Sequence, residues 1–362
     1  MTIFATRRKN TRQVQVGDVP VGGQAPVAVQ SMTNTFTQDV AATVAQIHRL
    51  EAAGCEIIRV AVPDRLAASA IADIKKDITI PLIADIHFDH RLALAAARAG
   101  ADGLRLNPGN IGGTDKVKAV VDCAGERDIP IRIGVNSGSL EKDILNKYNG
   151  ATPEGMVESA LRHVEILEAL DFRAIKISLK ASDVERTVTA YRLLSEQSDY
   201  PLHLGVTEAG GLYAGIVKSA LGIGMLLAEG IGDTLRVSLT RDPVEEVRVG
   251  YEILKGLGIR RHGPEIISCP TCGRCKIGLF DIAEQVERAL LSNPHPIKVA
   301  IMGCVVNGPG EAREADVGVA GGDGEGILFK KGEVIRKFPQ ERIVEVLLEA
   351  VREFGDSLDE NS

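Results

Sequence analysis

The sequence lacks any uninterrupted apolar stretch close to the roughly 18 residues that a membrane-spanning helix needs. No apolar segment follows the charged N-terminus, so we expect no secretory signal. Positive charge is also scarce, because 42 lysines and arginines face 49 aspartates and glutamates and leave a formal net charge of −7. This balance disfavours bulk attraction to nucleic acid or to an anionic membrane. We therefore expect a soluble, cytoplasmic protein with no nucleic-acid or membrane partner.

The length of 362 residues exceeds that of a usual single hydrophobic core and predicts one large domain with a smaller one. An apolar content of 44% and a charged content of 25% exclude a disordered or fibrous chain. A basic segment with glycine and proline at 256–264 interrupts the pattern and is interpreted as a linker. The expected domains are residues 1–262 and 263–362.

Short runs rich in leucine or β-branched residues recur along the first domain, and each is followed by a longer amphipathic segment. The eight runs are 27–31, 57–62, 81–88, 103–108, 131–136, 174–180, 202–208 and 234–239. Their number and spacing predict an α/β fold, a parallel (β/α)8 TIM barrel, with an open doubly wound sheet as the alternative. A β-hairpin is expected at 13–23, and a small α+β domain after residue 263.

Polar side chains recur at the carboxyl ends of these runs, where barrel enzymes carry their chemistry. Several lie two residues apart, so that their side chains share one face of a strand and point into the barrel mouth. The residues are Arg59, Asp85, His87, Arg105, Asn107, Arg132, Asn136, Lys176, Ser178, Lys180, His203, Glu208, Arg236 and Ser238.

The cations in this series predict an anion-binding mouth. Any one of them could be a core or capping residue, but six positive side chains in one cavity would repel one another by several kcal/mol. Asp85 and Glu208 cannot neutralise all of them, so we expect a multiply charged anionic ligand, most simply a diphosphate. The glycine-rich turn 107–113 can present backbone N–H groups to phosphate. The loop at 137–155 is either a lid or an ordinary surface connection.

Cysteines gather in the last quarter of the chain. In a reducing compartment the six cysteines should be thiols or metal ligands, and Cys55 and Cys123 fit small buried positions. The spacing of the remaining four matches neither a zinc ribbon, nor a ferredoxin run, nor a radical-SAM motif, and these four are Cys269, Cys272, Cys275 and Cys304. Spacing alone leaves zinc and an iron–sulfur cluster open.

Gly308, Pro309 and Gly310 predict a sharp turn after the last cysteine, which we expect to direct Glu311 back toward the cysteines. Its carboxylate is either a helix N-terminal group or a metal ligand.

Nine sequence blocks resemble those of the bacterial 4-hydroxy-3-methylbut-2-enyl-diphosphate synthase family, in family order and across nearly the whole chain. The blocks are QSMTNT (30–35), ADIHF (84–88), LRLNPGNIG (104–112), IRIGVNSGSLEKD (131–143), KASD (180–183), GVTEAGG (205–211), GIGDTLRVSL (230–239), CPTC (269–272) and GCVVNGPGEA (303–312).

The resemblance implies reductive ring opening and dehydroxylation of 2-C-methyl-D-erythritol 2,4-cyclodiphosphate to (E)-4-hydroxy-3-methylbut-2-enyl diphosphate, late in isoprenoid precursor synthesis. It implies an oxidoreductase with a 4Fe–4S cluster held by Cys269, Cys272, Cys304 and Glu311. Reduced flavodoxin or ferredoxin would be the electron donor, and the enzyme would be a homodimer. Cys275 lies outside the CPTC motif and is expected not to be a ligand.

The chemistry of this reaction divides the barrel residues by expected role. His87 and Glu208 are candidates for proton delivery to the departing hydroxyl group. The expected substrate-binding residues are Arg59, Arg105, Asn107, Arg132, Asn136, Lys176, Lys180, Arg236 and Ser238. Two alternatives stay open from the residues alone: a zinc-dependent or pterin-type transferase, and a redox sensor or binding module without catalysis.

Overall fold

The computed structural model describes residues 8–304 and 312–359, and the chain divides into two compact units between Arg260 and Arg261. Within these described ranges, no helix combines the length and the apolar character that crossing a bilayer requires.

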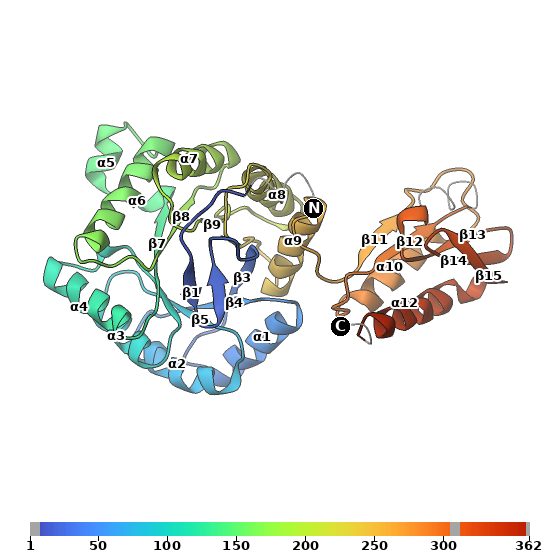
Figure 1. The fold of residues 1–362 in the computed structure, drawn as a ribbon, viewed down its shortest axis with the longest axis horizontal. Helices are drawn as coiled ribbons and strands as arrows, with labels where there is room; N and C mark the ends of the chain where they lie inside the picture. The colour runs from blue at the N-terminus through green and yellow to red at the C-terminus, as the bar shows by residue number, and fades with distance from the viewer. Residues whose placement is uncertain (1–7, 305–311, 360–362) are drawn as a thin grey trace. The chain divides into compact units, whose positions relative to one another are not determined.

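The first unit is a parallel barrel, as Figure 1 shows. Its eight strands follow the order β8-β7-β6-β5-β4-β3-β10-β9, and a parallel bridge between Ile177 and Leu202 brings β8 to the segment that enters β9. This confirms the predicted (β/α)8 barrel. The strands are β3 (Ala28–Met32), β4 (Ile57–Ala61), β5 (Leu82–Asp85), β6 (Gly103–Arg105), β7 (Ile131–Asn136), β8 (Ile175–Lys180), β9 (His203–Leu204) and β10 (Thr234–Leu235).

Helices surround the strands on the outside of the barrel (Figure 1). Many begin at an aspartate whose carboxylate accepts a backbone N–H of the first turn, for example Asp39, Asp64 and Asp183. The helices are α1 (Val40–Ala52), α2 (Arg65–Asp77), α3 (His90–Arg98), α4 (Thr114–Gly125), α5 (Lys142–Lys147), α6 (Pro153–Glu168), α7 (Val184–Gln197), α8 (Leu212–Ala228) and α9 (Pro243–Gly256).

The predicted N-terminal hairpin closes one end of the barrel. Strands β1 (Val14–Val16) and β2 (Val19–Val21) are antiparallel, and their valines pack against Ala28, Ile57 and Ile83 near the starts of the barrel strands. Apolar side chains therefore fill this end, and the polar inward-facing residues lie toward the carboxyl ends of the strands.

Strand β9 is shorter than its sequence run, and Gly205, which follows it, is closely surrounded by its neighbours. A Cβ on Gly205 would lie 2.6 Å from the carbonyl oxygen of Arg236 and 2.8 Å from Nζ of Lys180. Glycine at this position admits the Lys180 side chain into the barrel.

The second unit is an α+β domain with a mixed five-stranded sheet in the order β11-β12-β13-β14-β15. The sequence predicts a strand at 297–303 and a hairpin at 326–338, which are β12 and the pair β14–β15, whereas β11 and β13 are not predicted. The strands are β11 (Glu265–Ser268), β12 (Lys298–Met302), β13 (Val317–Gly321), β14 (Glu325–Lys330) and β15 (Glu333–Pro339). Helices α10 (Leu279–Leu290) and α12 (Ile343–Asp359) pack their apolar faces on the sheet, with Val286, Val346 and Val351 fully buried.

Candidate active site

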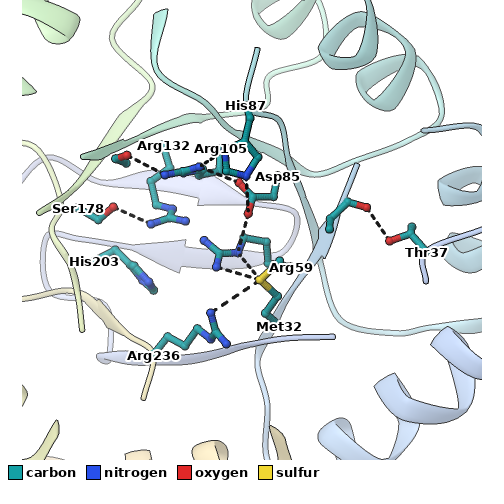
Figure 2. A network of polar contacts seen from close by, with 12 residues as sticks. Met32, Thr37, Arg59, Asp85, His87, Arg105, Arg132, Ser178, His203 and Arg236 are labelled. Carbon is teal, nitrogen blue, oxygen red and sulfur yellow. Dashed lines mark hydrogen bonds and ion pairs between the residues drawn. The ribbon is translucent and has the colours of Figure 1, made fainter. Parts of the chain in front are cut away.

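Asp85 is the centre of a buried network of charged side chains inside the barrel (Figure 2). Its Oδ1 lies 3.2 Å from Nη1 of Arg105, and its Oδ2 lies 3.7 Å from Nε of Arg59. Burial acts to raise the pKa of Asp85, but the nearby Arg59, Arg105 and Arg132 outweigh it, and the pKa is lowered overall. The carboxylate is therefore ionised, and it lies between the guanidinium groups of Arg59 on β4 and Arg105 on β6.

Arg105 at the end of β6 and Asn107 just beyond it are hydrogen-bonded to Gly134 within β7. Asn107 donates to the carbonyl of Gly134 at 3.1 Å and accepts from its N–H at 2.9 Å, while Nη2 of Arg105 donates to the same carbonyl at 2.8 Å. A Cβ on Gly134 would lie 2.4 Å from Nε of Arg105, so glycine leaves space for this guanidinium. The side-chain amide of Asn107 is therefore hydrogen-bonded to the backbone of Gly134 through both its oxygen and its nitrogen.

Arg132 and Lys176 lie deepest among the cations, on paired positions of β7 and β8. Arg132 donates to Oγ of Ser178 at 2.7 Å, whereas its Nε and Nη2 have no partner among the described residues. Nζ of Lys176 likewise has no partner in the described part of the chain, although Lys176 is only 1% exposed. Burial, followed by the charge of Arg132, lowers the pKa of Lys176 to about 7.

Lys180 and His203 form a second buried pair. Nζ of Lys180 lies 3.3 Å from Nε2 of His203, and Nδ1 of His203 lies 2.8 Å from Oγ1 of Thr234. Burial, followed by the charge of Arg132 and the other arginines, lowers the pKa of Lys180 well below its ordinary value. Burial, followed by the charge of Lys180, lowers the pKa of His203 well below its own.

Arg236 pairs with a carboxylate that the sequence analysis missed. Its Nε and Nη2 lie 3.2 Å and 3.4 Å from the carboxylate oxygens of Glu246 on α9, which also accepts the N–H of Leu239 at 3.0 Å. The sulfur of Met32 receives N–H groups of Arg59 at 3.0 and 3.2 Å and of Arg236 at 3.7 Å. Glu246 precedes Val247 in α9, and both belong to the buried face of this helix. A carboxylate on an otherwise apolar helix face was the sequence signal that could have identified it.

The remaining predicted residues lie nearer the surface. His87 is exposed, with Nδ1 at 3.4 Å from Nη1 of Arg105 and Nε2 at 3.9 Å from Oδ2 of Asp85. Glu208 is exposed, adopts a φ of 52°, and has no ion pair within the described ranges. Asn136, at the end of β7, and Ser238, three residues beyond β10, are half-buried. Glu246, rather than Glu208, is therefore the second carboxylate against the arginines.

The positive charge of the network exceeds its negative charge. Four arginines and two lysines converge from five strands and their extensions, and among the described residues their ion-pair partners are Asp85 and Glu246. Free donors remain on Arg132 and Lys176. Such an arrangement favours an anion with several negative oxygens, which can receive charge-assisted hydrogen bonds from different walls of the barrel.

In the second domain, the cysteines gather at one end of the sheet. Strands β11 and β12 are parallel neighbours, Cys269 directly follows β11, and Cys304 follows β12 by two residues. The N–H of Cys269 donates to the carbonyl of Ile301 at 3.1 Å. Hydrogen bonds from the backbone N–H and the guanidinium of Arg274 lower the pKa of the exposed Cys272. In turn, the hydrogen bond to Cys272 and the charges of Cys272, Cys304 and Cys269 raise the pKa of Arg274.

Thiolate donors fit an iron–sulfur cluster or zinc rather than a hard cation such as magnesium. Within the described ranges, no three histidine, cysteine, aspartate or glutamate side chains form an arrangement that could hold a metal ion. The predicted fourth ligand, Glu311, lies outside the described residues.

Cys275 differs from the other three cysteines of this group in its surroundings. Its Sγ donates to the carbonyl of Ile277 at 3.3 Å, and a Cβ on Gly303 would lie only 2.6 Å from this sulfur. The thiol therefore packs against the backbone of the segment that leads to Cys304.

Comparison with known proteins identifies related chains in both domains. Residues 11–251 match the GcpE TIM-barrel domain, and residues 265–353 match the GcpE protein C-terminal domain. A protein of Geobacter sulfurreducens named 4-hydroxy-3-methylbut-2-en-1-yl diphosphate synthase (flavodoxin) is 62% identical over 95% of this chain and 98% of its own. A protein of the same name from Bacillus cytotoxicus is 58% identical over 98% of this chain and 97% of its own.

Solved structures similar to the chain share little sequence with it. Dihydropteroate synthase of Yersinia pestis is 13% identical, with a TM-score of 0.47, over 68% of this chain and 98% of its own. The 3-dehydroquinate dehydratase of Geobacillus kaustophilus is 13% identical, with a TM-score of 0.48, over 71% of this chain and 99% of its own. The two domain matches and the near full-length relatives together show that the chain is an enzyme and belongs to the GcpE family of 4-hydroxy-3-methylbut-2-en-1-yl diphosphate synthases.

Proposed function

We propose that this enzyme opens the ring of 2-C-methyl-D-erythritol 2,4-cyclodiphosphate reductively and releases (E)-4-hydroxy-3-methylbut-2-enyl diphosphate. The conversion consumes two electrons, breaks a C–O bond to phosphate, and removes a hydroxyl group that takes up one proton to leave as water. The excess of buried cations over Asp85 and Glu246 in the barrel is the single observation that supports this substrate most strongly.

The barrel cations would bind the diphosphate and stabilise its charge as it leaves carbon. Arg59 and Arg105 are held by Asp85, and Arg236 is held by Glu246, so these guanidinium groups are ordered before the ligand arrives. Arg132 and Lys176 have nitrogen atoms without protein partners, which suits them to receive phosphate oxygens. Lys180, Asn107, Asn136 and Ser238 complete the proposed substrate-binding set.

Proton delivery is proposed for His87 and Glu208. Both side chains are exposed, and each follows a strand whose inward residues belong to the cation network. The left-handed backbone of Glu208, with a φ of 52°, is a conformation that a non-glycine residue seldom adopts, and such backbone is concentrated at functional sites.

Cys269, Cys272, Cys304 and Glu311 are the proposed ligands of a 4Fe–4S cluster. When bound, the cluster would supply the electrons that no side chain can provide. The effect of Arg274 on Cys272 favours the thiolate form that a metal ligand needs. Cys275, engaged with Ile277 and Gly303, is proposed to remain outside this set.

We propose flavodoxin as the electron donor because it is printed in the names of the relatives, with ferredoxin as the alternative. A homodimer in the cytoplasm is proposed as the working form. The domains proposed to carry the two halves of the chemistry are residues 1–262 for substrate binding and residues 263–362 for the cluster.

The test is anaerobic reconstitution of the full chain with iron and sulfide, followed by assay with the cyclodiphosphate and a low-potential donor. We expect release of the linear diphosphate in a two-electron stoichiometry. A colourless protein that contains zinc and gives no turnover would favour a zinc-dependent enzyme instead.

A further inference from the structure

Helix α6 buries a histidine beneath the two loops that follow β6 and β7. His163 is 3% exposed, its Nδ1 lies 3.2 Å from the backbone N of Gly109, and its Nε2 lies 3.0 Å from Oε1 of Glu141. A backbone N–H can only donate, so Nδ1 must be the acceptor and Nε2 must carry the proton that Glu141 accepts. Burial, opposed by Glu141, lowers the pKa of His163 and favours this neutral ring.

Both partners are themselves fixed. The second carboxylate oxygen of Glu141 accepts from Oγ of Ser159 at 2.8 Å, and Ser159 lies one turn before His163 on α6. A Cβ on Gly109 would lie only 2.8 Å from Cε1 of His163, so the loop approaches the ring as closely as a residue without a side chain permits. The imidazole thus bridges two loops that are far apart in the sequence.

The two loops leave strands that carry guanidinium groups, with Arg105 as the last residue of β6 and Arg132 as the second residue of β7. Gly109 follows Arg105 on β6, and Glu141 follows Arg132 on β7. Inside the barrel, Asn107 already joins the ends of the two strands through both hydrogen bonds to Gly134. The His163 bridge adds a second connection between the same two chain segments, outside the barrel.

We propose that His163 is a positioning residue for the reaction, which joins Gly109 to Glu141 and thereby sets the spacing of Arg105 and Arg132 for the diphosphate. This inference rests on the proposed function, because it assumes that these arginines bind the substrate. A histidine that merely fills the core would contribute to stability without influencing the affinity of the folded enzyme for its ligand.

Three substitutions of His163 test its two hydrogen bonds, to Gly109 and to Glu141, together and separately. His163→Phe keeps the ring volume and removes both hydrogen bonds, His163→Asn keeps an acceptor near the Nδ1 position, and His163→Gln keeps a donor near the Nε2 position. His48→Phe is the matched control, because His48 is an exposed histidine of α1 whose Nε2 lies 2.6 Å from the carbonyl of Asp77.

The measurement is anaerobic calorimetric titration of the reconstituted full-length enzymes with the cyclodiphosphate, together with Tm and iron content. For His163→Phe we expect a Kd raised roughly tenfold or more, since small misplacements of binding groups have effects of this size or larger. His163→Asn should recover part of the affinity, and His48→Phe should match the wild type.

Two different failures can be told apart. Wild-type affinity in folded His163→Phe, or a lower Tm with unchanged Kd in all three variants, would overturn the positioning role. If His163→Phe does not fold, an unchanged Kd in both His163→Asn and His163→Gln overturns it equally. Absence of cyclodiphosphate binding in the wild type and in His48→Phe would instead contradict the proposed function.

Discussion

Nζ of Lys180 lies 3.3 Å from Nε2 of His203 inside the barrel, and neither group has a carboxylate as its hydrogen-bond partner within the described ranges. Two basic groups in contact cannot both be charged without repulsion, and burial strengthens this effect. Burial and the charge of Arg132 lower the pKa of Lys180 well below its ordinary value, and burial and the charge of Lys180 do the same to His203. The ligand-free barrel therefore holds less positive charge than its sequence suggests.

Binding of a diphosphate should be accompanied by proton uptake. An anion near Lys180 and His203 raises pKa values that burial and neighbouring cations have lowered, so both groups become more protonated on binding. Calorimetric titrations near neutral pH, in two buffers of different ionisation enthalpy, should give different apparent enthalpies with the sign of uptake. The same enthalpy in both buffers would contradict this expectation.

Lys176→Met should stabilise the fold and weaken substrate binding. The folded-state pKa of Lys176 is about 7, below the roughly 10.4 of a free lysine, so the unfolded chain binds the proton more tightly. Lys176 therefore lowers the free energy of unfolding. This destabilisation has its full size below the folded-state pKa, decreases as pH rises, and vanishes above the unfolded-state pKa. We expect a gain of roughly a few kcal/mol near pH 7 and a smaller gain near about pH 9.5.

Thermal unfolding at the two pH values, with Kd for the cyclodiphosphate, checks both halves of this prediction. A Tm below that of the wild type at neutral pH would show that Lys176 is a stabilising core residue, and an unchanged Kd would remove it from the substrate-binding set.

Asp85→Asn should destabilise the ligand-free enzyme, because it removes the buried charge that Arg59 and Arg105 share. Loss of one partner from a buried ion pair costs roughly 3–5 kcal/mol. Inorganic pyrophosphate should raise the Tm of this variant more than that of the wild type, since the anion replaces part of the missing charge. Equal shifts in the two proteins would argue against an anion site beside Asp85.

Substitution of the cysteines should separate ligands from neighbours. Cys275→Ser should keep the iron content and the activity, because its thiol already donates to Ile277 and lies against Gly303. Cys304→Ser should lose both. Iron and sulfide analysis with visible absorbance measures the result, and loss of the cluster in Cys275→Ser would overturn the ligand set that includes Glu311.

The barrel could be predicted because its signals are local. Each strand is a short apolar run, and several of the helices that follow begin at a capping residue such as Asp64 or Asp183. The alternation along β8 places Lys176, Ser178 and Lys180 on one face. The cations of the mouth follow from the same alternation, since every inward position at a strand end faces the same cavity.

The partners of these cations could not be predicted in the same way. Glu246 meets Arg236 from a helix, Met32 meets Arg59 from the neighbouring strand, and the Asn107 amide turns to backbone of β7. Such contacts depend on tertiary packing, which no short period in the sequence encodes. Strand β13 was missed for a related reason, because its glycines resemble a turn until Gly318 is seen to accommodate Phe329.

The most direct test of substrate binding by the barrel compares Arg132→Ala with Arg127→Ala, an arginine just beyond α4, in anaerobic turnover assays with the cyclodiphosphate. We expect Arg132→Ala to raise KM roughly tenfold or more, with unchanged iron–sulfur absorbance, since a charge-assisted contact is lost. Arg127→Ala should behave as the wild type. A wild-type KM in Arg132→Ala, or loss of its cluster absorbance, would contradict the binding of the diphosphate by this network.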